Sequence, residues 1–322
     1  MNSLINEYQK VPVKEYPNKL KDKPLVSVLV QTFQHVDYIK QCLDGILMQK
    51  TNFGFEIMLG EDASSDGTRE ICIEFAKKHS DKIRLFLHDR KNVIYISGRA
   101  TGRFNLFYNI HKARGKYFAL CEGDDYWIDP LKLQKQVDFL EANPDFAICF
   151  HPIKIEKDGT LINDYITHEV PDTTDIYDLT NKSNYIHTPS VVFRNYLTDF
   201  PNALFKSVIG DYMIYMYIAQ YGKIRKLKDT SAVYRVHEGG IWSNLDSIDK
   251  RERSKNTFKY LISFISDAKV INILKKKHIT SNLKFFFLLS IKKRKIEISI
   301  LKDCFEFGFL LFFKAIFEKI IK

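Results

Sequence analysis

Four short apolar runs alternate with four segments of helical pattern between residues 25 and 142, and this alternation constrains the fold most. The apolar runs have the length of buried strands, and the first helical segment places apolar residues three and four apart. The expected strands are residues 25–30, 55–59, 83–88 and 116–121, and the expected helices are residues 36–48, 69–78, 105–113 and 129–142. Such alternation predicts an α/β fold with a parallel sheet covered by helices.

Two acidic clusters follow strands of this predicted sheet. Glu61 and Asp62 follow the second strand, and Glu122, Asp124 and Asp125 follow the fourth. Ligands of open α/β sheets bind beyond the carboxyl ends of the strands. A single acidic turn is readily explained as a solvated loop, whereas two acidic turns at one edge of a sheet indicate a binding site.

The sequence carries carboxylates where nucleotide-binding folds often carry glycines. No GxGxxG follows the first strand and no GxxxxGK[ST] occurs, so a dinucleotide-binding dehydrogenase and a P-loop NTPase lose their main support. Carboxylates hold a phosphate through a divalent cation, because Mg²⁺ and Mn²⁺ take carboxylate and phosphate oxygens as ligands. Asp124 is therefore a candidate ligand of a cation that neutralises a departing diphosphate. Asp62 is a candidate acceptor of hydrogen bonds from a base or a ribose.

Four segments, in this order along the chain, resemble family 2 glycosyltransferases of the GT-A fold. The segments are residues 26–34 (VSVLVQTFQ) with 61–68 (EDASSDGT), residues 121–127 (CEGDDYW) with 129–134 (DPLKLQ), residues 210–212 (GDY), and residues 234–243 (YRVHEGGIWS). The second of them resembles the DxD segment of the family. Each motif is weak alone, but their common order makes the resemblance specific over about residues 25–245.

The resemblance implies a GT-A fold, with a Rossmann-like, mostly parallel sheet flanked by helices and a helical C-terminal tail. It also implies an inverting, metal-dependent glycosyltransferase of the hexosyltransferase type. The expected donor is a nucleotide sugar, in particular a UDP-sugar, and the expected acceptor is a hydroxyl of a glycan or of a lipid-linked molecule. Cell-surface polysaccharide biosynthesis is the process that such an enzyme would serve.

The nucleotide contacts implied by the resemblance come from three loops. Thr32 and Phe33 would line the base pocket, and Asp62 would face the uracil or the ribose with Glu61 beside it. Glu122 takes the place of the first Asp of DxD and would lie near the ribose.

The resemblance also assigns the metal and the chemistry. Asp124 would hold Mn²⁺ or Mg²⁺, with His237 as a further contact to the metal or the diphosphate. Asp211 would be the general base that takes the proton of the acceptor hydroxyl. Asp125 either binds an acceptor hydroxyl or caps the following turn, and Trp127 either lines the acceptor site or packs in the core. The other histidines are expected to be structural.

Three positions depart from the pattern of the family. The acidic pair is Glu61-Asp62 in place of Asp-Asp, Ala63 stands where a glycine is usual, and Gln34 replaces the common asparagine.

The positive charge is concentrated at the C-terminus. Residues 251–322 hold 17 Lys and Arg against 6 Asp and Glu, a net charge of +11, whereas the other 250 residues have a net charge of −1. Lysine clusters at 275–277 and 292–295 flank the apolar residues 283–289, and a further apolar block covers 305–321. This combination is typical of helices at an anionic membrane surface. A helical cap or an oligomer interface with a solvated basic face is the alternative.

We therefore expect an N-terminal arm (1–24), a catalytic domain (25–245) and a basic helical region (246–322). The five cysteines include no CxxC pair, which favours reduced, buried thiols. No signal peptide and no membrane span are recognisable, so a cytoplasmic protein bound peripherally at the inner face of the cell membrane is expected.

Two other functions remain open. A non-catalytic adaptor for membranes or nucleic acid would use the basic tail, although no nucleic-acid recognition motif accompanies it. A nucleotidyltransferase that makes sugar nucleotides would need a glycine-rich loop with Arg and Lys after the first strand, where the sequence has Gln31-Thr32-Phe33-Gln34.

Overall fold

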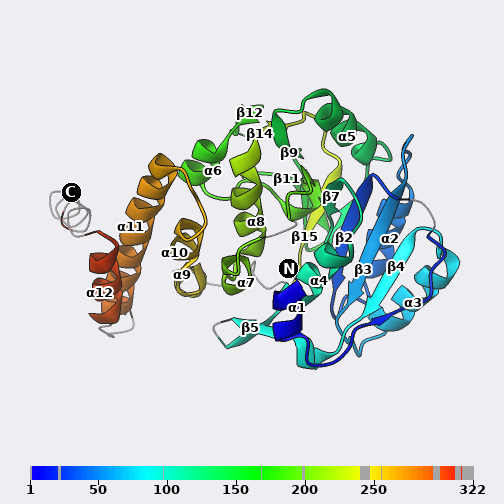
Figure 1. The fold of residues 1–322 in the computed structure, drawn as a ribbon, viewed down its shortest axis with the longest axis horizontal. Helices are drawn as coiled ribbons and strands as arrows, with labels where there is room; N and C mark the ends of the chain where they lie inside the picture. Colours follow the sequence, from blue (N-terminus) through cyan, green and yellow to red (C-terminus); the bar gives the residue numbers. More distant parts are fainter. Residues whose placement is uncertain are drawn as a thin grey trace. The chain divides into compact units, whose positions relative to one another are not determined.

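The computed structural model describes residues 2–20, 23–96, 98–167, 169–197, 200–239, 247–254, 256–292, 298–308 and 313 (Figure 1). The chain divides into two compact units. The first comprises Met1–Asp175, Asn184–Phe200 and Ile218–His237, and the second comprises Ile176–Ser183, Pro201–Tyr217 and Glu238–Lys322. This division differs from the linear boundaries expected from the sequence, because residues 176–183 and 201–217 group with the C-terminal helices.

A large sheet forms the centre of the first unit. Within the described residues it has nine strands in the order β1-β4-β3-β2-β7-β13-β9-β14-β12. Strands β4, β3, β2 and β7 are parallel neighbours, as the alternation predicts. The strands are β1 (Lys14–Glu15), β2 (Val26–Thr32), β3 (Phe55–Glu61), β4 (Ile83–Leu87), β7 (Tyr117–Leu120), β9 (Phe146–Phe150), β12 (Thr173–Thr174), β13 (Val192–Arg194) and β14 (Lys223–Lys226).

Four helices of the first unit match the expected segments to within a few residues. They are α2 (Ile39–Leu47), α3 (Thr68–Lys78), α4 (Arg103–Lys112) and α5 (Lys132–Ala142), and a further helix, α1 (Asn2–Tyr8), lies in the N-terminal arm. Alternate residues of the parallel strands pack with α2, α3 and α5 in one apolar core. Helix α4 is attached to β2 and β3 by polar contacts, since the amides of Asn105 and Asn109 donate to the backbone carbonyls of Gly60, Val30 and Met58.

Smaller strands complete the first unit. A four-stranded sheet has the order β11-β10-β15-β8, and β5 pairs with β6. These strands are β5 (Ile94–Ile96), β6 (Arg99–Thr101), β8 (Tyr126–Trp127), β10 (Lys154–Lys157), β11 (Thr160–Asn163) and β15 (Ala232–Val236), and short 3₁₀ turns cover Arg90–Asn92, Thr188–Ser190 and Ala219–Tyr221. The small sheet positions predicted site residues. Strand β8 directly follows Asp125, and strand β15 directly precedes His237. The N-terminal arm is not purely extended, since it contains α1 and the edge strand β1.

The second unit is helical. Its helices are α6 (Ile176–Lys182), α7 (Ala203–Lys206), α8 (Gly210–Ile218, of which Ile218 belongs to the first unit), α9 (Ser247–Ser254), α10 (Thr257–Ile262), α11 (Ala268–Lys292) and α12 (Ile298–Phe307). Leu283, Phe285 and Leu289 of α11 are buried together with Ile300 and Cys304 of α12.

In the described part of the tail, the apolar residues pack between helices, as in the helical cap that was the alternative to a helix at a membrane surface. Leu283, Phe285 and Leu289 of the apolar block 283–289 lie in this core, and Lys277 donates to the carbonyls of Thr180 and Asn181 and to the hydroxyl of Ser183. Lysines 293 and 295 and most of the apolar block 305–321 lie outside the described residues. None of the helices that the structure describes is long and apolar enough to cross a membrane. All five cysteines are buried and unpaired, as expected.

Candidate active site

Parallel pairing brings both acidic clusters to one edge of the sheet. Thr32, the last residue of β2, is in register with Glu61, the last residue of β3, and Leu29 of β2 is in register with Leu120 at the end of β7. The loops that follow these strands therefore leave the sheet side by side. They carry Phe33–His35, Asp62–Asp66 and Glu122–Asp125.

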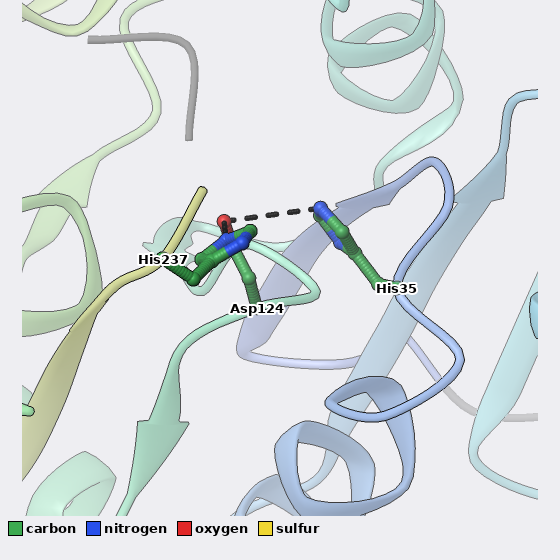
Figure 2. Close-up of side chains that lie close together, drawn as sticks. All are labelled: His35, Asp124 and His237. Atoms are coloured by element: carbon green, nitrogen blue, oxygen red, sulfur yellow. Dashed lines mark hydrogen bonds and ion pairs between the residues drawn. The ribbon is translucent and has the colours of Figure 1, made fainter. Parts of the chain in front are cut away.

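Asp124 is the meeting point of two histidines (Figure 2). Nε2 of His237, one residue beyond β15, lies 3.0 Å from Oδ2 of Asp124. Nε2 of His35, from the loop after β2, lies 3.8 Å from the same oxygen. The three side chains offer one donor atom each within 4.8 Å of one another, the arrangement of a metal site.

The charges in this cluster affect one another. Burial works to raise the pKa of Asp124, but the hydrogen bond with His237 and the charge of His35 outweigh it and hold that pKa below its usual value. Burial lowers the pKa of His35, although the carboxylate of Asp124 opposes the change. Both shifts favour the deprotonated carboxylate and the deprotonated imidazole, which are the forms that bind metals.

Asp124 also belongs to a second group of three side chains, all of them carboxylates. Glu122, Asp124 and Asp125 also place one oxygen each within 4.8 Å of the others. Asp125 is buried, and its Oδ1 accepts a hydrogen bond from the backbone amide of Arg235 at 2.9 Å, whereas no partner is found for its Oδ2. Asp125 therefore anchors the loop to β15 and does not cap the following turn.

Arg235 holds the loop of Asp124 in place. Its guanidinium donates to the carbonyl of Asp124 at 2.6 Å and to the side chain of Gln41 at 2.6 Å, and it lies over the rings of Tyr38 and Tyr126. Because these contacts come from three different elements, Arg235 is the residue that fixes the orientation of the loop.

Trp127 packs in the core, which is one of the two roles that the sequence leaves open for it. Its side chain is 2% exposed, and its indole N–H donates to the carbonyl of Pro189 at 2.9 Å. The expectation of an acceptor contact is corrected here, because a buried indole with a satisfied N–H offers no face to a sugar.

Arg90 organises the part of the edge where the sequence predicts nucleotide contacts. Its guanidinium is 2.5 Å from Oδ2 of Asp62 and 4.0 Å from the ring centroid of Phe33, so one arginine joins two predicted contacts. Burial raises the pKa of Asp62 to about 6, against the attraction of Arg90, and the charge of Glu61 adds to the increase. Phe33 is exposed, as a stacking residue must be.

Glu61 and Thr32 are less accessible than the resemblance implies. Glu61 is fully buried, pairs with Arg69 and accepts a hydrogen bond from the backbone amide of Ser64. The structure thus corrects its expected role, because its carboxylate shapes the acidic turn and is shielded from a ligand. Thr32 is also buried, and its hydroxyl lies 3.3 Å from Nδ1 of His35.

The departures from the pattern of the family adopt an unusual backbone conformation. Gln34 and Ala63 have φ angles of 56° and 59°, in the left-handed region. Asparagine and glycine, the residues usual at these positions, enter that region at lower cost than glutamine and alanine.

Asp211 lies in the first turn of α8, within the second unit. Gly240-Ile241-Trp242-Ser243, the end of the last motif, lies outside the described residues.

Three residues of this site are not predicted from the sequence. His35, Arg90 and Arg235 all contact predicted site residues, yet none was assigned a role in it. A signal existed for two of them, since His35 follows Thr32-Phe33-Gln34 directly and Arg235 lies between Tyr234 and His237 inside a quoted motif. Arg90 has no motif around it.

Comparison with known proteins agrees with this geometry. The family model described as glycosyl transferase family 2 matches residues 27–200, more than half of the chain. The chain belongs to glycosyl transferase family 2. An uncharacterized protein of Mycobacterium tuberculosis, Rv1520, is 34% identical over 224 residues, which are 67% of this family 2 chain and 60% of the relative. The match thus spans about three fifths of that relative.

Solved structures support the fold. Residues 1–349 of TarS from S. aureus give a TM-score of 0.60 at 18% identity and cover 90% of this family 2 chain and 80% of the TarS chain. The mannosyltransferase PcManGT of Pyrobaculum calidifontis gives 0.56 at 18% identity, with 89% and 78% covered. These likenesses confirm the GT-A fold expected from the sequence, and family membership favours glycosyl transfer over the adaptor and the nucleotidyltransferase.

Proposed function

We propose that this chain is an inverting glycosyltransferase that moves a sugar from a nucleotide sugar to an acceptor hydroxyl. The observation that carries the proposal is the contact of Asp124 with His237 at the carboxyl edge of the sheet, in a chain of family 2. A UDP-sugar is the proposed donor. TarS has been solved with UDP and with UDP-GlcNAc, and PcManGT with GDP-Man and Mn²⁺.

A divalent cation fits the residues at this edge. A carboxylate oxygen and an imidazole nitrogen 3.0 Å apart are suitably spaced to share one ion. Asp124 and His237 would hold Mn²⁺ or Mg²⁺, and the bound cation would neutralise charge on the leaving diphosphate. Arg235 keeps the Asp124 loop in position for this task.

The protein residues divide the remaining work. Phe33 offers an exposed aromatic face for the base, and Asp62, held by Arg90, offers a carboxylate to the base or the ribose. Glu122 is proposed to lie near the ribose. Asp211 accepts the proton of the acceptor hydroxyl while that oxygen bonds to the anomeric carbon and the bond to the diphosphate breaks. Attack from the face opposite the diphosphate inverts the anomeric centre.

A donor screen tests this function. The purified chain is incubated with Mn²⁺ or Mg²⁺, a panel of UDP- and GDP-sugars and a range of glycan and lipid-linked acceptors, and the released nucleoside diphosphate is measured. We expect release with one class of donor that rises when the right acceptor is present. Absence of release with every donor and metal would contradict the proposal and favour the adaptor.

We also propose that the protein works at the cytoplasmic face of the membrane, where its tail contacts anionic lipid. The net charge of +11 in residues 251–322 supports this, because each Lys or Arg near such a surface contributes about 1 kcal/mol. Flotation of the full chain with anionic and with neutral liposomes tests it. We expect flotation with anionic liposomes at low salt, and recovery of the chain only in the soluble fraction would contradict it.

A further inference from the structure

His35 has no part in the reaction proposed above, yet its imidazole faces the same carboxylate oxygen as that of His237. We propose that His35 is a third protein ligand of the cation, and that the resulting site of two imidazoles and one carboxylate selects Mn²⁺ over Mg²⁺. This inference rests on the proposed function only in its assumption that a divalent cation binds at Asp124.

The distances suit one shared ion. Two donor atoms that each lie about 2.1 Å from an ion are at most about 4.2 Å apart. The separations of 3.0 Å and 3.8 Å from Oδ2 of Asp124 to the two Nε2 atoms are both within this limit. The side chains of His35, Asp124 and His237 keep 17%, 19% and 14% of their surface exposed, so an ion can reach all three.

Hydrogen bonds of the backbone and a contact of Nδ1 fix the orientation of His35. Its backbone amide donates to the hydroxyl of Thr68 at 2.8 Å, and the next amide, of Val36, donates to Asp66 at 3.0 Å. On the ring, Nδ1 lies 3.3 Å from the hydroxyl of Thr32, which leaves Nε2 directed at Asp124. A hydrogen bond to the far nitrogen is the usual way in which proteins orient a metal-binding histidine.

The loop of Asp124 is shaped to admit this ring. A Cβ atom on Gly123 would lie 2.9 Å from Nδ1 of His35 and 2.6 Å from the hydroxyl of Thr32. Such distances are too short for a side chain, so glycine at 123 allows the two loops to approach. The close approach places the imidazole of His35 against the metal loop, away from open solvent.

The donor set determines which metal is preferred. Mg²⁺ prefers oxygen ligands and retains several waters, whereas Mn²⁺, which also binds carboxylate and water, is a first-row transition ion and accepts imidazole nitrogen more readily than Mg²⁺ does. A site with Asp124 alone would bind the two ions through oxygen and would discriminate little between them. Each imidazole added to that carboxylate shifts the preference further toward Mn²⁺.

The loop of His35 also carries Phe33, to which the proposed function assigns the stacking of the base. A cation bound to His35 would restrain this loop in the position that stacks the base. Metal and nucleotide are therefore expected to bind cooperatively.

Direct metal binding tests the inference without any sugar transfer. The full chain, freed of metal, is titrated with Mn²⁺ in the presence and absence of UDP, and free Mn²⁺ is followed by electron paramagnetic resonance. Mg²⁺ competition then gives the preference between the two ions. We compare wild type with His35→Ala and with His79→Ala, a control at the opposite edge of the sheet, since His79 follows α3 and precedes β4.

We expect His35→Ala to weaken Mn²⁺ binding at least tenfold and to lower the preference for Mn²⁺ over Mg²⁺, with His79→Ala unchanged. Electron spin echo modulation of the bound Mn²⁺ should detect two histidine nitrogens in wild type and one in His35→Ala. The count of nitrogens in the wild-type spectrum tests the inference even if a variant fails to fold. Circular dichroism checks that the variants fold.

A single bound nitrogen in wild type, or unchanged Mn²⁺ affinity in His35→Ala, would overturn the inference. Failure of the proposed function is distinguishable from this result. A chain that binds Mn²⁺ through two histidines but transfers no sugar keeps the inference and loses the function. A chain that transfers sugar with Mn²⁺ affinity independent of His35 does the reverse.

Discussion

Nε2 of His237 lies 3.0 Å from Oδ2 of Asp124, although 113 residues separate the two in the chain. The contact joins the end of β15 to the loop that follows β7. It depends on Arg235, two residues before His237, which donates to the carbonyl of Asp124 and pairs through its backbone with Asp125. A metal placed here would therefore be held by two separate elements of the same unit.

Replacement of Asp124 by Asn should abolish metal-dependent donor binding. The amide keeps the size of the side chain but loses the negative charge that a divalent cation requires. We expect the affinity for UDP in the presence of Mn²⁺ to fall at least tenfold, measured by calorimetry. Asp44→Asn, at an exposed pair with Lys40, is the control. Equal UDP affinity of wild type with Mn²⁺ and with EDTA would contradict the metal assignment.

Replacement of Asp211 by Asn should separate binding from chemistry. The amide cannot accept the proton of the acceptor hydroxyl, and general base catalysis contributes about 10²–10⁴-fold to rate. We expect kcat to fall by about that factor with the donor affinity unchanged. Asp145→Asn, at an exposed pair with Lys223, should transfer sugar normally. Wild-type turnover by Asp211→Asn would remove Asp211 as the base.

Replacement of Gly123 by Ala should disturb the proposed metal site by displacing residues that orient its ligands. The new Cβ would meet the hydroxyl of Thr32 at 2.6 Å and Nδ1 of His35 at 2.9 Å, so the two loops must separate. We expect Mn²⁺ affinity to fall at least tenfold, because small displacements of metal ligands are costly. Gly54→Ala is the control, since nothing lies within 4 Å of its Cβ position. Equal effects of the two substitutions would show that Gly123 has no special role.

Replacement of Ala63 by Gly should stabilise the protein. Ala63 has a φ angle of 59°, where a Cβ atom costs about 1 kcal/mol. We expect the free energy of unfolding in urea to rise by up to about 1 kcal/mol, less the entropy that glycine gains in the unfolded chain. Ala142→Gly, in the last turn of α5, should lower it instead. A loss of stability in Ala63→Gly would contradict the strain at this position.

The stability of the protein should rise with pH above neutrality because of Lys132. Its ammonium is buried, 4.2 Å from the ring centroid of Trp127 and 2.8 Å from Oε1 of Gln136, and burial lowers its pKa to about 7. Below pH 7 both the folded and the unfolded chain bind this proton, and the full cost of burying the charge is present. As the pH rises above 7, the folded chain releases the proton while the unfolded chain keeps it, so folding becomes more favourable.

The slope of the free energy of unfolding against pH measures this effect. We expect the free energy of unfolding of wild type to gain up to about 1 kcal/mol per pH unit between pH 7 and 9 relative to Lys132→Met. Lys78→Met, an exposed lysine at the end of α3, should retain the wild-type slope. Parallel curves for wild type and Lys132→Met would mean that Lys132 stays charged in the folded protein.

The sequence alone determined the sheet and the edge at which the site lies. Apolar runs of strand length and helical periodicity are local patterns, and parallel strands bring the residues after β3 and β7 to the same edge. For this reason the sequence predicts Asp62 and Asp124 at that edge, and the motif around His237 predicts this histidine there as well. The helix expected from residue 129 begins at Lys132 because Pro130 and Leu131 form a turn before it.

The tertiary structure decided which side chains meet at that edge. His35 looks like any loop histidine in the sequence, and only the approach of two loops at Gly123 places it against Asp124. Glu61 and Asp62 are adjacent in the sequence, yet the first is buried against Arg69 and the second is paired with Arg90. Periodicity reports which face of an element is buried, whereas the partner of a charged side chain depends on loops that converge from distant parts of the chain. That convergence is a property of the folded unit, and it decides which residues can hold a cation.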